Sequence, residues 1–443
     1  KTVGMFFEDF NGITIEGNQT TVFLHGKMMT MAFLNCKNVR VEGISFEFES
    51  PNMAELEVLD VNPDLVRVKI AKGCQYDILN GKLIFYGEGW RFRDNMYHAL
   101  RFVPRTEQMF YSSWKPFSDS EAFSMDSDNI MFRGDFSNIE LEQGDIITVR
   151  DHYRDNAGGF ISHCSDVQLK DVNLHYINGM GLVSQSSENI AFIKVRVAPR
   201  KESGRVVAAW ADCFHFSGCR GLITIDSCYT SGSHDDPINV HGTHLKIQEI
   251  NGKNLVVRFI HHQTYGFEAF FKGDTVGFVK PEDLLLYGKA VIKSAQMLNK
   301  REMELVLDKV PGDIRVGDCL ENITWTPQLV VKNSIFEHVN TRGLLVTTRR
   351  KVLIENNLFY RTGMHAILIA NDCNFWFESG PVRDVTIRGN RFIQCGYNQG
   401  EEGFMIAIKP ETHNFVNKKY IHSNIKIYDN EFHVLNDKVL FAR

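Results

Sequence analysis

The fold is decided by a nine-residue stretch, Lys351-Val-Leu-Ile-Glu-Asn-Asn-Leu-Phe359, that recurs along the chain. Apolar and polar residues alternate over about four positions, a turn-forming residue follows, and a large apolar residue comes next. This pattern predicts a short strand, a turn and a second strand. Further clear copies are Asn38-Val-Arg-Val-Glu-Gly-Ile-Ser-Phe46, Asp166-Val-Gln-Leu-Lys-Asp-Val-Asn-Leu174, Asp384-Val-Thr-Ile-Arg-Gly-Asn-Arg-Phe392 and Asn424-Ile-Lys-Ile-Tyr-Asp-Asn-Glu-Phe432, and weaker copies begin at Gly12, Asn189 and Gly221.

Neighbouring copies lie at intervals that indicate a solenoid. Aligned by eye on first apolar positions such as Val167, Leu222, Val330 and Val352, they are roughly 22 to 33 residues apart. A period of about two dozen residues built only of strands and turns is typical of one coil of a parallel β-helix. Long stretches with helical periodicity are nearly absent, which argues against a TIM barrel.

Two intervals are far longer than one coil, and we interpret each as an inserted domain. Both inserts contain short alternating strands joined by Asn-Gly and Gly-Asp turns, which are typical of small antiparallel barrels. The predicted fold is therefore all-β, a right-handed parallel β-helix with two inserted antiparallel β-barrels. The helix comprises 1–54, 151–244 with the candidate catalytic coils, and 328–443, and the barrels comprise 55–150 and 245–327.

Composition and charge exclude several classes of protein. The chain has 43% apolar residues, 49 Lys plus Arg and 54 Asp plus Glu, so its net charge of −5 provides no basic field for nucleic acid. No apolar run is long enough to span a membrane. The chain opens without an initiator Met, and we expect a targeting segment to be missing. The nine cysteines resemble neither a disulfide framework nor a zinc site, and Cys36, Cys164 and Cys219 are expected to stack as a buried column.

Carboxylates gather on two successive coils. Asp212 and Asp235 are 23 residues apart, which is one coil, and equivalent positions in neighbouring coils lie about 4.8 Å apart. Asp236 precedes Pro237, which marks a strand start or bend where both aspartates can reach the surface. Three carboxylates at one place repel one another and raise the pKa of at least one. An acid beside a base is what glycosidic bond cleavage needs.

The residues also suggest roles within this group. Asp235 has acidic neighbours on both sides and is expected to have the most strongly raised pKa and to act as the general acid. Asp212 and Asp236 would then hold the attacking water. A shift of one residue in the strand start would exchange the directions of Asp235 and Asp236, so that assignment stays open.

Other side chains on the same strands are candidates for binding sugar hydroxyls, and Trp210 or Trp376 for stacking on a sugar ring. No metal or cofactor is expected, and the sequence leaves the oligomeric state open. The complete candidate binding set is Trp210, His215, Asn239, His241, Arg342, His365, Asn371 and Lys409.

The aspartate motifs resemble those of known families. A lone Asp followed one coil later by an Asp-Asp pair is similar to polygalacturonase-type β-helix glycosidases, although Thr341-Arg342-Gly343 and Ala407-Ile408-Lys409 replace that family's Gly-His-Gly and Arg-Ile-Lys motifs. Glycoside hydrolase family 110 is more similar, through the two barrels and the motifs Trp-Ala-Asp-Cys-Phe-His-Phe216 and His-Asp-Asp-Pro-Ile-Asn-Val-His-Gly-Thr243.

The family 110 resemblance implies an exo-acting, inverting α-1,3-galactosidase that removes terminal galactose from blood-group-B-type or linear glycans. It implies a secreted or periplasmic bacterial enzyme and assigns catalysis to Asp212, Asp235 and Asp236. Besides a polygalacturonase-like hydrolase, two alternatives remain open at this point. One is a pectate-lyase-like enzyme in which the aspartates bind Ca²⁺ and Arg342 abstracts a proton, and the other is a non-catalytic glycan-binding solenoid.

Overall fold

The computed structural model describes residues 2–95, 98–111, 116–151, 153–412, 414–415 and 419–434. Within these ranges the chain is almost entirely β, and the only helical pieces are the 3₁₀ turns Lys201–Ser203 and Tyr397–Glu402. None of the described helices is long and apolar enough to cross a bilayer. Residues 435–443, which we assigned to the last coils, lie outside the described residues.

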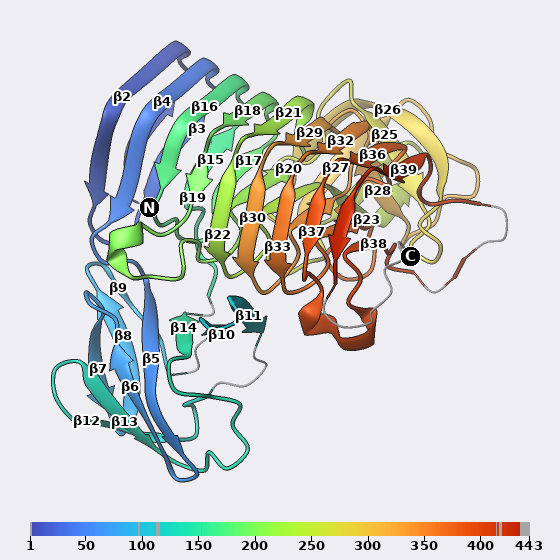
Figure 1. Ribbon diagram of the computed structural model, residues 1–443. Coiled ribbons are helices and arrows are strands. Elements are labelled where there is room, and N and C mark those ends of the chain that lie inside the picture. Colours follow the sequence, from blue (N-terminus) through green and yellow to red (C-terminus); the bar gives the residue numbers. More distant parts are fainter. Residues whose placement is uncertain are drawn as a thin grey trace.

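The predicted parallel β-helix is confirmed (Figure 1). One coil consists of β20 (Phe214–Ser217), β21 (Arg220–Asp226) and β22 (Tyr229–Ser233), after which the chain enters β23 (Ile238–Asn251) one level along the axis. Strands β20 and β23 pair in parallel without a register shift, so that Phe214 pairs with Ile238 and His215 pairs with Asn239. Residues one coil apart therefore stack, as the repeat predicted.

Strands of equivalent coils form long parallel sheets. The sheet that carries the site contains β1 (Val3–Glu8), β3 (Met29–Leu34), β15 (Gly159–Ser162), β17 (Leu182–Gln185), β20, β23, β31 (Leu344–Val346), β34 (Ile367–Ile369) and β38 (Ile406–Ile408). The other parallel sheet contains β2 (Asn11–Leu24), β4 (Lys37–Phe48), β16 (Ser165–Leu174), β18 (Glu188–Ile193), β19 (Arg196–Val197), β21, β22, β29 (Gln328–Lys332), β30 (Ile335–Val339), β32 (Lys351–Glu355), β33 (Leu358–Thr362), β36 (Asp384–Arg388), β37 (Arg391–Ile393), β39 (Ile425–Tyr428) and β40 (Glu431–His433).

The corner of each repeat explains its turn residues. Asn356 has a φ of 57° and Gly389 a φ of 64°, so the chain needs a residue that tolerates the left-handed conformation. In both coils the next residue is an asparagine, Asn357 or Asn390, whose buried side chain forms hydrogen bonds to a neighbouring coil. The backbone N–H of Asn357 donates to Oδ1 of Asn390, and that of Asn390 donates to Oδ1 of Asn430, each at 2.9 Å. This asparagine ladder ties consecutive coils together.

The structure corrects our alignment by one residue in two coils. Leu222 is 42% exposed, and Ile223 is the buried residue that pairs with Ile190. The register shifts at this point, where Gly221 adopts a φ of 70° and adds one residue to the turn. In the next coil the buried position is Leu329 rather than Val330.

The predicted cysteine column is confirmed as part of the helix core. Cys36, Cys164 and Cys219 are buried, and the backbone N–H of Cys36 donates to Sγ of Cys164 at 3.3 Å. Ser187 takes the corresponding place in the coil between Cys164 and Cys219, because the N–H of Cys164 donates to its Oγ at 3.0 Å. Burial raises the pKa of Cys164 to about 11 and that of Cys219 to about 12, so both remain neutral thiols.

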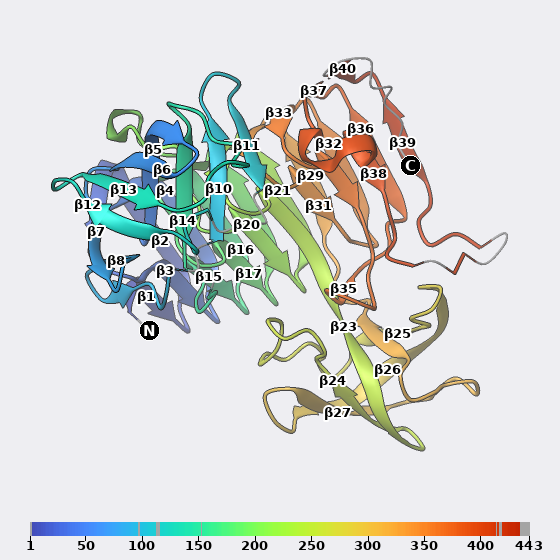
Figure 2. The same ribbon diagram turned by 90° about the horizontal axis from the view of Figure 1, so that it is seen from below.

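Both insertions are antiparallel, as predicted (Figure 2). The first contains β5 (Met53–Asn62), β6 (Leu65–Ile70), β7 (Gln75–Leu79), β8 (Lys82–Gly87), β9 (Trp90–Arg91), β10 (His98–Val103), β11 (Gln108–Tyr111), β12 (Glu121–Ser124), β13 (Asn129–Arg133) and β14 (Ile146–Arg150). The second contains the distal half of β23 with β24 (Asn254–Arg258), β25 (Thr275–Val279), β26 (Leu286–Met297), β27 (Glu302–Leu307) and β28 (Cys319–Asn322). Where each domain begins and ends stays a prediction.

Strand β23 joins the helix to the second insertion without a break. Its first residues pair with β20 and β31 of the parallel sheet, and its later residues pair with β24 and β28. Between these halves the short strand β35 (Glu378–Ser379) pairs antiparallel with Gly242 and Thr243. The second insertion is thereby fixed beside the outer surface of the parallel sheet.

Candidate active site

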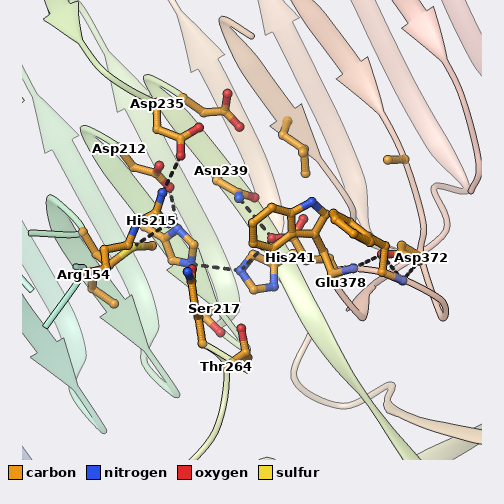
Figure 3. Close-up of a pocket in the computed structure, with 18 of the residues that line it drawn as sticks. Arg154, Asp212, His215, Ser217, Asp235, Asn239, His241, Thr264, Asp372 and Glu378 are labelled. Carbon is orange, nitrogen blue, oxygen red and sulfur yellow. Dashed lines mark hydrogen bonds and ion pairs between the residues drawn. The ribbon is translucent and has the colours of Figure 1, made fainter. Parts of the chain in front are cut away.

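A cavity of about 740 Å³ opens on the parallel sheet where β17, β20, β23, β31 and β34 run side by side. Its other walls come from the loop 262–267 of the second insertion, from Arg154 and Asn156, and from the segment 371–378. Its size is that of an ordinary small-ligand site. Figure 3 shows acidic and basic side chains converging on it.

The three predicted aspartates all line this cavity. Asp212 lies just before β20, and Asp235 and Asp236 lie just before β23, one coil later. The coils are joined here by backbone bonds, since Cys213 N–H donates to the carbonyl of Asp236 at 3.1 Å and Asp235 N–H to that of Ala211 at 3.2 Å. The one-coil spacing thus brought the aspartates together as expected.

The environment of Asp235 contradicts its expected protonation. Nη2 of Arg154 donates to Oδ2 of Asp235 at 2.7 Å, and Nη2 of Arg342 lies 3.8 Å from Oδ1. Burial acts to raise the pKa of Asp235, but the positive charges of Arg154 and Arg342 outweigh it and the pKa is lowered. The prediction that Asp235 has the most strongly raised pKa is wrong, because Arg154, which the coil repeat does not place, lies against this carboxylate.

Asp236 is fixed by one arginine. Nε of Arg342 donates to both carboxylate oxygens, at 3.0 and 2.9 Å, and its Nη2 lies 2.8 Å from Oδ2. The backbone N–H of Arg342 adds a contact of 3.2 Å. Asp236 is 1% exposed, and burial together with Asp235 raises its pKa to about 7 against the attraction of Arg342. All of these contacts use the carboxylate as an acceptor.

Asp212 has a different partner. It is 3% exposed, and its Oδ2 lies 2.7 Å from Nδ1 of His215. Burial and the charge of Asp235 raise its pKa well above the ordinary value, and Arg154 opposes them only in part. The cavity therefore holds a carboxyl that favours the neutral form beside one that is ionised.

Five of the eight predicted binding residues line the cavity: His215, Asn239, His241, Arg342 and Asn371. Nε2 of His241 lies 2.9 Å from Nε2 of His215. The side-chain amide of Asn239 donates to Glu378 at 3.3 Å. Asn371 is buried, and its Oδ1 accepts the N–H of Gly380, which fixes the start of the 371–378 wall.

The other three predicted binding residues do not line the cavity. Trp210 is 2% exposed and packs under the guanidinium of Arg150 at 3.9 Å, so the prediction that it stacks on a sugar is wrong. It faces the first insertion, whose last strand carries Arg150. The imidazole of His365 is 5% exposed and donates from Nδ1 to the carbonyl of Phe404. Lys409 follows β38, a strand that contributes nothing to the cavity lining.

Sequence reasoning missed several residues of the cavity. Arg154 follows the first insertion, Tyr265 belongs to the second, and Glu378 lies on the antiparallel strand β35. None of them occupies a coil position, so the repeat could not place them. Trp376, which we predicted as a stacking residue, does line the cavity, where it is 40% exposed and its ring packs 4.5 Å from that of His261. Its neighbour Phe375, which was not predicted, also lines the cavity and is 67% exposed. The signal that could have found Phe375 is its place next to Trp376 in the sequence.

Three parts of the chain match known family models. Residues 54–147 match a family model described as GLAA-B beta-barrel domain I, 254–320 match GLAA-B beta-barrel domain II, and 321–436 match a right-handed beta helix region. Among solved structures, the catalytic domain of a GH87 α-1,3-glucanase aligns over 81% of this chain and 71% of its own at 8% identity, with a TM-score of 0.25 that carries no argument.

Curated relatives match over the whole chain. α-1,3-Galactosidase A of Bacteroides fragilis strain YCH46 is 42% identical over 100% of this chain and 73% of its own length. α-1,3-Galactosidase A of Akkermansia muciniphila is 35% identical, and α-1,3-galactosidase B of Bacteroides thetaiotaomicron is 33% identical, with the same coverage. The β-helix, its two barrels and these relatives agree, and the chain belongs to the α-1,3-galactosidase family, glycoside hydrolase family 110.

Proposed function

We propose that the protein is an exo-acting, inverting α-1,3-galactosidase whose catalytic group is Asp212, Asp235 and Asp236. The observation that carries the proposal is that one cavity holds two carboxyl groups in opposite surroundings, since Asp235 contacts Arg154 and Arg342 while buried Asp212 contacts His215. Asp235 is ionised between two arginines, while buried Asp212 favours the neutral form. Hydrolysis of a glycoside with inversion requires one carboxyl group of each kind.

The protonation states assign the roles. Asp212 donates its proton to the glycosidic oxygen as the bond to the anomeric carbon breaks. Asp235 accepts a proton from the water that attacks that carbon from the opposite face. Asp236 remains bound to Arg342 and holds its guanidinium beside Asp235. In this scheme Asp212 replaces Asp235 as the general acid.

The form of the cavity supports attack on chain ends. The sheet provides its floor, and the loop 262–267 and the segment 371–378 enclose it from other elements. Such a cavity suits a terminal galactose, with the remaining sugars leaving across the exposed rings of Phe375 and Trp376. Glycans of this kind, including blood-group-B-type and linear α-1,3-galactosyl chains, lie outside cells, and we therefore propose a secreted or periplasmic enzyme.

The carboxylate contacts favour the hydrolase over the Ca²⁺-dependent lyase. Both oxygens of Asp236 accept from Arg342, and Asp235 accepts from Arg154, so guanidinium groups occupy the positions that a hard cation would need. The same contacts engage Arg342 in a salt bridge, which makes it a poor proton acceptor. Its pKa is raised by Asp236 and Asp235 despite its burial.

Product analysis tests the proposal. The protein is incubated with galactosyl-α-1,3-galactose, with a B-type trisaccharide, and with a trisaccharide in which the α-galactose is internal. We expect free galactose from the first two substrates and none from the third. Galactose-containing fragments from the third would refute exo action. An EDTA-sensitive unsaturated product would support the lyase, and binding of all three without turnover would support a glycan-binding solenoid.

A further inference from the structure

The aspartates that line the cavity lie in two segments outside the long sheets, one between β19 and β20 and the other between β22 and β23. Within 198–213, all of which the structure describes, strand pairing is limited to isolated bridges of Ala209 with Ile177 and Ser233. Residues 234–237 belong to no strand. A ladder of several residues, such as the one that joins β20 to β23, is absent here, so the position of the aspartates depends more on side-chain contacts.

The first insertion packs one face of its strands β10 and β14 against the helix (Figure 2). Leu100 on β10 belongs to the hydrophobic core of the helix, whereas its neighbour Ala99 belongs to the separate core of the insertion. Thr148 on β14 pairs with Leu100, and Val149 pairs with Ala99. Because side chains alternate between the two faces of a strand, Thr148 faces the helix and Val149 faces the core of the insertion.

Strand β14 holds the segment before β23 through one buried hydrogen bond. Oγ1 of Thr148 lies 2.6 Å from Nε2 of His234, and the two residues are 0% and 1% exposed. His234 directly precedes Asp235 in the chain. Nδ1 of His234 has no hydrogen-bond partner among the described residues, so Thr148 is the one partner that they give this ring. A buried polar group that loses its partner is costly, and the contact with Thr148 therefore fixes the ring.

The same strand holds the segment before β20. The guanidinium carbon of Arg150 lies 3.9 Å from the centre of the Trp210 ring, which is within the range of a cation–π contact. Trp210 is buried two residues before the first aspartate of the cavity. Glu55 on the neighbouring strand β5 adds a contact, since its carboxylate accepts the backbone N–H groups of Val206 and Val207, each at 3.1 Å. The first insertion thus contacts both segments that carry the aspartates.

We propose that Thr148 and Arg150 are positioning residues through which the first insertion holds the catalytic aspartates in place. The catalytic part rests on the proposed function, whereas the contacts do not. Neither residue lines the cavity, so each acts through the buried ring that it contacts. Four residues beyond the end of β14, Nη2 of Arg154 donates to Asp235 at 2.7 Å. One strand therefore positions both this carboxylate and the arginine that binds it.

Three variants of β14 separate positioning from stability. T148V removes the hydroxyl group that contacts His234, T148S keeps a hydroxyl group, and V149A opens a cavity in the core of the insertion on the opposite face. With galactosyl-α-1,3-galactose we expect kcat of T148V to fall by about tenfold to 10²-fold while KM stays within about twofold, because a displacement of about 1 Å from a distant change can cost roughly 10²-fold in rate. T148S should keep the kcat of the wild type. V149A should lower Tm and leave kcat unchanged.

Three results of this comparison would overturn the proposal. They are a wild-type kcat in T148V, an equal loss of kcat in T148S, and a loss of kcat in V149A as large as that in T148V. The last result would show that activity follows the stability of the insertion and not the contact with His234.

Hydrogen exchange of the full chain, followed by mass spectrometry, provides a readout that needs no activity. In T148V we expect the amides of 234–237 to exchange faster than in the wild type, while those of β21 and β29 keep their wild-type rates. Faster exchange in all of these segments would show a general loss of stability and would overturn the proposal. If the wild type hydrolyses no galactoside while the exchange pattern holds, the proposed function fails and the positioning of 234–237 by Thr148 stands.

Discussion

Replacement of Asp212 by Asn separates proton donation from every other property of this carboxyl. The Asn amide can still donate to Nδ1 of His215, so the chain to His241 and the packing around this buried position are preserved. Only the transferable proton is lost. General acid catalysis is worth roughly 10²–10⁴-fold, which corresponds to about 2.7 to 5.4 kcal/mol of transition-state stabilisation. We expect a loss in this range with galactosyl-α-1,3-galactose.

The assay compares this natural substrate with dinitrophenyl α-galactoside, whose leaving group needs little protonation. We expect D212N to hydrolyse the activated substrate within about tenfold of wild type. The control is D235N, which lacks the base and is expected to be slow with both substrates. Azide, which can replace activated water, should accelerate D235N and not D212N. If D235N is rescued by the activated substrate and D212N is not, Asp235 is the general acid and our assignment is refuted.

Three other perturbations have distinct expected results. The activity of the wild type should rise with pH as Asp235 ionises, below the ordinary pKa of Asp, and should fall as Asp212 ionises, well above it. R154M removes a positive charge that favours the ionised form of both groups, so both limbs of the kcat/KM profile should move to higher pH. Unmoved limbs would contradict the contact between Arg154 and Asp235. W376A removes an exposed ring and should raise KM for the B-type trisaccharide several-fold without lowering Tm. The control is F415A, which removes a ring that is exposed outside the cavity. An unchanged KM in W376A would show that Trp376 does not bind the substrate. N390L leaves the backbone N–H of Asn357 unsatisfied, so the free energy of unfolding should fall by about 1–3 kcal/mol in chemical denaturation while kcat stays unchanged. Wild-type stability in N390L would show that the asparagine ladder contributes little to folding.

The fold could be predicted because a β-helix repeats its local chemistry in every coil. The turn at Asn356 and Asn357 has the same requirement as those of neighbouring coils, a left-handed residue followed by one that bonds along the axis. Alignment failed by one residue at Leu222, where Gly221 lengthens the turn while the alternation continues on either side. The alternation of apolar and polar residues does not show that a residue has been added to the turn, and only the pairing with the neighbouring strand shows which residue is buried.

The candidate site was predictable to the extent that it depends on coil spacing. Stacked strands bring equivalent positions of neighbouring coils together, and for this reason one cavity contains Asp212, Asp235 and Asp236. Their protonation was not predictable, because it depends on Arg154, which arrives from beside an insertion. Trp210 shows the same limit, since the residue that covers it, Arg150, belongs to the first insertion. Tertiary contacts between distant segments decide which charged groups become neighbours and which side chains are buried, and a sequence repeat does not encode those contacts.

The anomeric form of the first product tests the central claim most directly. Proton NMR follows the opening minutes of hydrolysis of galactosyl-α-1,3-galactose, before mutarotation mixes the anomers. In the proposed mechanism Asp235 activates water on the face opposite the bond that Asp212 protonates, so β-galactose should appear first and α-galactose should grow in later. If α-galactose forms first, the two aspartates do not act as a separate acid and base, and the inverting mechanism is contradicted.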